Sequence, residues 1–159
     1  YIEVTYILPW DEATKNLLSR LFNITNHLNI FAFSNGDCDM FEGVHNIIGT
    51  VQIDRMSIDN VSCIRRTREM IMKILRINRV ETMNFSADDI DKFELRMLIN
   101  CLPKTVTDLS IDVRSNLFKD DIQYWRSNAE NLFERNEMDK IMLKSADETI
   151  YVKSNYEFS

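Results

Sequence analysis

The sequence is poor in glycine, proline, cysteine and histidine. Its 159 residues include three Gly, two Pro, three Cys and two His. So few glycines exclude a nucleotide site of the usual kind, in which a glycine-rich loop lets the backbone approach the phosphates. No Ser/Gly-rich stretch or long run of one charge sign marks a linker or a disordered tail. We therefore expect one repeat-built domain over residues 1–159 and, since the chain begins at Tyr1 instead of Met, part of a longer protein.

The cysteines do not form a recognisable framework. Cys38, Cys63 and Cys101 are odd in number and widely spaced, which matches neither a disulfide scaffold nor a paired-ligand zinc site. A reducing, intracellular setting is therefore expected, in the cytoplasm or the nucleus. No apolar run has the length needed to cross a bilayer, and no signal segment precedes the first strand.

Residues suited to catalysis or metal binding are scarce. His27 and His45 are the only histidines, and a strand and a turn separate them. The segment 35–40 begins like a calcium loop, but Met40 replaces the glycine and Asn46 the final glutamate, so a turn before a helix is the expected structure. Without a nucleophile elbow or a phosphate loop, we expect no enzyme, no metal and no cofactor.

Charge also limits the possible partners. The formal net charge is −6, and Arg65, Arg66 and Arg68 make the one concentrated basic run. Nucleic-acid binding through these arginines would work against the net field of the chain. We expect the run to lie on the solvent face of a helix, with no nucleic-acid or membrane partner.

A spaced apolar pattern recurs along the chain. In each unit an apolar residue is followed three and five positions later by two more. The last two positions alternate as a half-buried strand requires, and the first lies at the bend before the strand. The units are Tyr1/Val4/Tyr6, Leu28/Phe31/Phe33, Ile48/Val51/Ile53, Val80/Met83/Phe85, Val106/Leu109/Ile111 and Met138/Ile141/Leu143. Their first residues lie 27, 20, 32, 26 and 32 positions apart, which predicts stacked supersecondary units.

The segments between these strands have helical periodicity. Asp11 is expected to cap the first helix, and 141–143 and 149–152 flank a short turn that predicts a hairpin. Expected buried stripes include Leu17, Leu18, Leu21 and Phe22; Ile90, Phe93, Met97, Leu98 and Cys101; and Ile122, Trp125, Ala129, Leu132 and Phe133. The fold expected is α/β: an irregular leucine-rich-repeat-like solenoid, with a parallel sheet, helices on one side and a C-terminal hairpin.

The sheet face away from the helices is the candidate binding surface. In a solenoid the non-core strand positions form rows of side chains on the concave face. Our predicted partner-binding residues on that face are Gln52, Asp54, Glu81, Asn84, Asp108, Ser110, Asp112, Lys140, Met142 and Lys144.

Several segments resemble the F-box-associated region of nematode F-box proteins. The stretch 17–33, a helix leading to a hydrophobic strand, looks like the opening of that region, and so do 70–75 followed by 80–85. The ending, 138–152 and then 156–158, is similar to its closing hairpin. The sequence departs from the family at Glu148, where an Asp-Gly turn would have glycine.

This resemblance implies the substrate-recruiting region of a Skp-cullin-F-box ubiquitin ligase. The F-box would lie upstream of Tyr1 and bind a Skp-family adaptor, while other subunits supply the chemistry. Two alternatives stay open. One is a leucine-rich-repeat scaffold unrelated to ubiquitination. The other is an α/β enzyme with a site at the carboxyl ends of the strands, near Ser34, Asp54, Ser86 and Asp112.

Overall fold

The computed structural model describes residues 2–4, 11–34, 43, 46–47, 51–59, 64–77, 79–88 and 90–154. The elements, in chain order, are β1 (Glu3–Val4), α1 (Glu12–Ile24), β2 (His27–Ser34), β3 (Gln52–Asp59), α3 (Ile64–Ile77), β4 (Thr82–Ala87), α4 (Lys92–Asn100), β5 (Asp108–Val113), the 3-10 turn η1 (Lys119–Asp121), α5 (Ile122–Arg135), β6 (Lys140–Lys144) and β7 (Thr149–Lys153). In this described part of the chain, a helix follows each of the strands β1, β3, β4 and β5.

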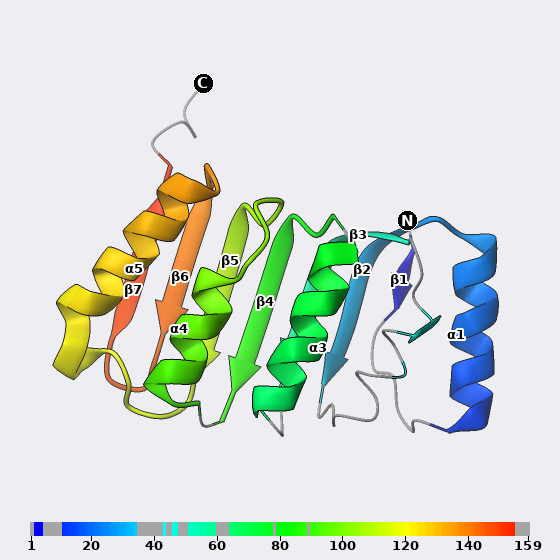
Figure 1. Cartoon of the computed structure of the whole chain (residues 1–159), viewed down its shortest axis with the longest axis horizontal. Helices are drawn as coiled ribbons and strands as arrows, with labels where there is room; N and C mark the ends of the chain where they lie inside the picture. Colours follow the sequence, from blue (N-terminus) through cyan, green and yellow to red (C-terminus); the bar gives the residue numbers. More distant parts are fainter. Residues whose placement is uncertain are drawn as a thin grey trace.

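One seven-stranded sheet joins these strands in the order of the sequence, β1 to β7. Each neighbouring pair from β1 to β6 is parallel, and β7 runs antiparallel to β6. Parallel neighbours need a crossover, and α3, α4 and α5 all lie on the same side of the sheet (Figure 1). The predictions of an α/β class, a mostly parallel sheet and a C-terminal hairpin are confirmed.

The helices of the described part are each too short or too polar to span a membrane.

The buried face of the sheet consists of in-register apolar rows. One row pairs Phe31, Met56, Met83, Leu109 and Ile141 across five strands, and all are fully buried. The next row continues through Ile58, Phe85, Ile111 and Leu143. A third lies before or at the strand starts and comprises Leu28, Ile53, Val80, Val106 and Met138, all buried.

These rows correct one predicted unit. The third unit is Ile53/Met56/Ile58, because Leu28 pairs with Ile53 and Phe31 with Met56. The predicted Ile48/Val51/Ile53 was therefore wrong by five residues. Both triplets satisfy the spacing, and only the pairing with β2 distinguishes them. With this correction the unit starts from Leu28 to Val106 lie 25, 27 and 26 residues apart, more regular than expected.

In two helices, part of the predicted buried stripe is exposed. Asp11 caps α1 as expected: its carboxylate accepts the Thr14 N–H at 2.9 Å, and this bond lowers the pKa of Asp11. However, Leu17 is 68% exposed, and α1 buries Leu18 and Phe22. In α4, Phe93 is 56% exposed, and the buried residues are Leu95, Leu98 and Ile99.

The end of α5 joins two neighbouring units. Arg135 donates hydrogen bonds to the carbonyls of Asn100 (2.7 Å) and Leu102 (2.8 Å), just after α4. The buried Asn136 amide donates to the carbonyls of Pro103 (2.9 Å) and Val106 (3.0 Å). Backbone carbonyls between α4 and β5 therefore obtain donors from the following unit.

Candidate partner-binding face

The sheet side away from the helix layer has mostly polar side chains, half-buried or exposed, wherever the structure describes it. On β4 the buried Met83, Phe85 and Ala87 alternate with half-buried residues, which are Thr82, Asn84 and Ser86. This alternation follows from the two-residue period of a strand with one face in the core. We call this side of β3 to β7 the open face.

The strand register aligns the open-face residues in three rows, with neighbouring strands about 4.8 Å apart. The first row is Arg55, Thr82, Asp108, Lys140 and Lys153; the second is Ser57, Asn84, Ser110, Met142 and Tyr151; the third is Ser86, Asp112, Lys144 and Thr149. Seven predicted residues lie in these rows: Asn84, Asp108, Ser110, Asp112, Lys140, Met142 and Lys144.

The remaining three lie at the amino ends of their strands. Gln52 and Asp54 are at the start of β3, because the true third unit begins five residues later than predicted. Glu81 directly precedes β4, and its N–H donates to the Asp54 carbonyl at 3.0 Å. The β3 residues in the rows are Arg55 and Ser57, which the prediction missed; the alternation that begins at Met56 was the available signal.

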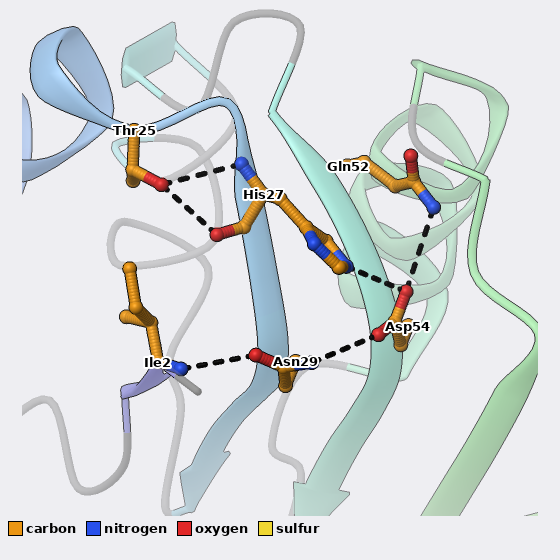
Figure 2. A network of polar contacts seen from close by, with 6 residues as sticks. All are labelled: Ile2, Thr25, His27, Asn29, Gln52 and Asp54. Atoms are coloured by element: carbon orange, nitrogen blue, oxygen red, sulfur yellow. Dashed lines mark hydrogen bonds and ion pairs between the residues drawn. The ribbon is translucent and has the colours of Figure 1, made fainter.

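Asp54 is the centre of a hydrogen-bond network that links β1, β2 and β3 (Figure 2). Its carboxylate lies 2.9 Å from His27 Nε2 and accepts from the side-chain amides of Asn29 (3.2 Å) and Gln52 (3.5 Å). The Asn29 oxygen accepts the Ile2 N–H at 3.0 Å. Through these hydrogen bonds the Asp54 carboxylate joins the amino ends of β2 and β3, and Asn29 joins β2 to the residue before β1.

An open pocket of about 250 Å³ adjoins this network, and its lining residues are Asn29, Ile30, Asp54, Arg55, Glu81 and Thr82. Its one hydroxyl, on Thr82, makes no hydrogen bond within the described ranges, so no base is positioned to activate it. Arg55 and Glu81 form no ion pair there either. The pocket therefore offers the Arg55 cation and the Glu81 carboxylate for contact with a polar ligand, beside the Asp54 carboxylate that the network already uses.

The residues of the enzyme alternative do not come together. Ser86 and Asp112 are register neighbours near the carboxyl ends of β4 and β5, and Ser34 ends β2. Asp54 is at the opposite end of the sheet, since it lies five positions before Asp59, the last residue of β3. At about 3.3 Å per residue this separates Asp54 from the carboxyl edge by roughly 16 Å.

No group of three or more potential metal ligands occurs among the described residues. Cys101 is exposed and has a free thiol. His45, Cys38, Cys63 and the calcium-like segment 35–40 lie outside the residues that the structure describes, and so do the side chains of Arg65, Arg66 and Arg68.

Lysines gather at the C-terminal end of the open face. Lys140 and Lys144 lie on β6, and Lys153 lies on β7 directly opposite Lys140. Between them, Met142 pairs with Tyr151, whose side chain is 53% exposed. We call these five residues the lysine patch. The β7 members were not predicted, because their face depends on the hairpin register.

Two lysines of this patch, Lys140 and Lys144, lack a close ion pair among the residues that the structure describes. Lys140 Nζ lies 3.6 Å from Asp108 Oδ2, a long and partly exposed contact. Lys144 and its register neighbour Asp112 form no ion pair in the described part of the chain.

No family model, curated protein or solved structure matches the chain.

Proposed function

We propose that this chain is a protein-interaction module that recruits a partner through its open face. The observation that carries the proposal is the exposure of one whole sheet side over β3 to β7, with polar side chains aligned in rows. The backbone of paired strands is already ordered, so binding there costs less conformational entropy than binding by a mobile loop.

We further propose that the architecture is a leucine-rich-repeat-like solenoid. Each strand with its return segment forms a unit of 25 to 27 residues between Leu28 and Val106. The buried rows connect each unit to the next, as in an array whose units bury their apolar faces against neighbours. The hairpin of β6 and β7 would close one end of this array.

The proposed partner class is the substrate of a ubiquitin ligase. The sequence resemblance to the F-box-associated region supports this, and it places the F-box in a longer parent protein. In that arrangement the F-box binds a Skp-family adaptor, the open face binds the substrate, and other subunits transfer ubiquitin in the cytoplasm or nucleus.

Affinity purification of the parent protein, followed by mass spectrometry, tests both the binding of a partner and the assignment to a ubiquitin ligase. We expect Skp-family and cullin subunits together with at least one substrate. The charge-reversal variant Glu81→Lys/Asp108→Lys/Asp112→Lys should retain about tenfold less substrate, because reversing three charges on the open face removes its charge complementarity to the partner.

The matched control is Glu69→Lys/Glu130→Lys/Glu134→Lys, which makes the same charge change at exposed positions of α3 and α5. It should retain the substrate. Equal retention by both variants would show that the open face is not the site. Absence of Skp and cullin subunits would remove the ligase assignment and leave a repeat scaffold unrelated to ubiquitination.

A further inference from the structure

The lysine patch has a charge opposite to that of the chain as a whole. The net charge is −6, yet three lysines share one side of the two-stranded β6–β7 hairpin. We propose that this patch binds an acidic segment of the partner protein. The inference rests on the proposed function, since it names the partner chemistry for part of the open face.

Electrostatics within the patch favour an anionic partner. Lys140 and Lys144 project from the same side of β6. Asp108 compensates Lys140 only at 3.6 Å, and Lys144 is exposed without an ion pair among the described residues. Carboxylates from a partner would supply a close counter-charge to each of these two lysines.

The apolar centre of the patch favours a peptide over a nucleic acid. Met142 and Tyr151 form a directly opposed pair between the lysines, and the exposed Tyr151 ring is suited to an apolar side chain. Two carboxylates adjoin the patch, because Asp108 and Asp112 on β5 are the register neighbours of Lys140 and Lys144. These carboxylates would repel a phosphate backbone, because a nucleic acid carries negative charge along its whole length. A peptide can instead have acidic residues opposite the lysines and uncharged residues opposite the carboxylates.

The register predicts the spacing of the partner's side chains. Lys140, Met142 and Lys144 follow one another at every second residue on the same side of β6. A segment lying extended along β6 also directs every second side chain to one side, with a similar rise per residue. Its recognition pattern is therefore acidic-x-apolar-x-acidic, with the apolar residue on Met142 and Tyr151.

A random twelve-residue peptide library, displayed on phage and selected against the purified chain, tests this pattern. We expect recovered peptides to have Asp or Glu at two positions four apart and an apolar residue midway. The best synthetic peptide should bind about tenfold more weakly to Lys140→Glu/Lys144→Glu by fluorescence anisotropy, since two attractive contacts become repulsive.

The control Lys73→Glu/Arg126→Glu makes the same charge change at exposed positions on α3 and α5 and should bind within about twofold of the unaltered chain. Lys144→Gln is a second test variant in case the double variant does not fold. It removes no ion pair among the described residues and should weaken binding about two- to fivefold. Circular dichroism melting checks that each variant is folded.

Recovered peptides without acidic enrichment, or equal binding by the patch and control variants, would overturn the inference. So would lysine-dependent binding of a twelve-nucleotide oligouridylate in the absence of acidic peptides, because it would identify a nucleic-acid site. If the substrate captured by the parent protein depends on Glu81, Asp108 and Asp112 but not on the patch lysines, the inference fails while the proposed function stands.

Discussion

Asn136→Ala is expected to destabilise the fold, because it removes hydrogen bonds between the end of α5 and the segment before β5. The Asn136 side chain is 4% exposed, and its amide donates to the carbonyls of Pro103 and Val106 at 2.9 and 3.0 Å. Alanine keeps the helix-terminal N–H bonds of this residue, which involve the backbone alone. The substitution therefore removes the two inter-unit bonds, together with the bond that Asn136 Oδ1 accepts from Nε of the exposed Arg135 at 3.0 Å.

The size of the effect follows from the burial of the two carbonyls. Val106 is fully buried, so water cannot readily replace its lost donor, and the cost is about 1–3 kcal/mol. Pro103 is half-buried and accessible to water, so losing its bond costs about 0.5–1.5 kcal/mol. Together the free energy of unfolding should fall by about 2–4 kcal/mol, and Tm by roughly 5–12 °C.

Urea denaturation followed by circular dichroism and tryptophan fluorescence measures this loss. Asn128→Ala is the matched control. Its side chain donates to the Tyr124 carbonyl at 2.8 Å within the same helix, and that carbonyl can also take part in the helical ladder. The control should lose less than about 1 kcal/mol. An equal loss in the free energy of unfolding for both variants would contradict a stabilising link between the two units.

Three further outcomes are expected. Trp125→Ala removes a fully buried ring and should cost about 3–5 kcal/mol in a urea titration, against under about 1 kcal/mol for the exposed Phe93→Ala; similar costs would contradict the assigned core. Glu137→Gly should raise Tm because Glu137 has a φ of 49°, whereas Glu134→Gly inside α5 should lower it; a lower Tm for both would refute backbone strain. Hydrogen bonds, chiefly from Ser145, lower the pKa of Asp147 from 3.8, so its stabilisation is complete above that pH and is lost as pH falls through the lowered pKa. Asp147→Asn should therefore reduce stability at pH 7 and progressively less below pH 3.8, and an equal reduction at both would exclude ionisation as the cause.

The local pattern was sufficient to predict most strands. The units beginning at Leu28, Val80, Val106 and Met138 were located correctly, because a half-buried strand requires its own apolar alternation wherever it pairs. The hairpin followed from two apolar segments around a short polar turn. These features depend on neighbours within a few residues, which the sequence displays directly.

The helix faces were harder to predict for a physical reason. In α4 the apolar residues are spread around the helix, so more than one stripe satisfies helical periodicity. Packing between α3 and α5 selects Leu95, Leu98 and Ile99, and it leaves Phe93 in solvent. Composition alone does not distinguish the two faces.

The sequence by itself determined the alternation of strands and helices, the apolar rows of most units, the cap at Asp11 and the hairpin, because each is a local consequence of side-chain type. Only the tertiary structure decided the frame of the third unit, since Ile48/Val51/Ile53 and Ile53/Met56/Ile58 satisfy the same pattern. Hydrogen bonding to β2, 25 residues earlier in the chain, selects the second frame. The Asp54 network and the lysine patch depend in the same way on pairing between strands, so the contacts that define the candidate site arise only when the sheet assembles.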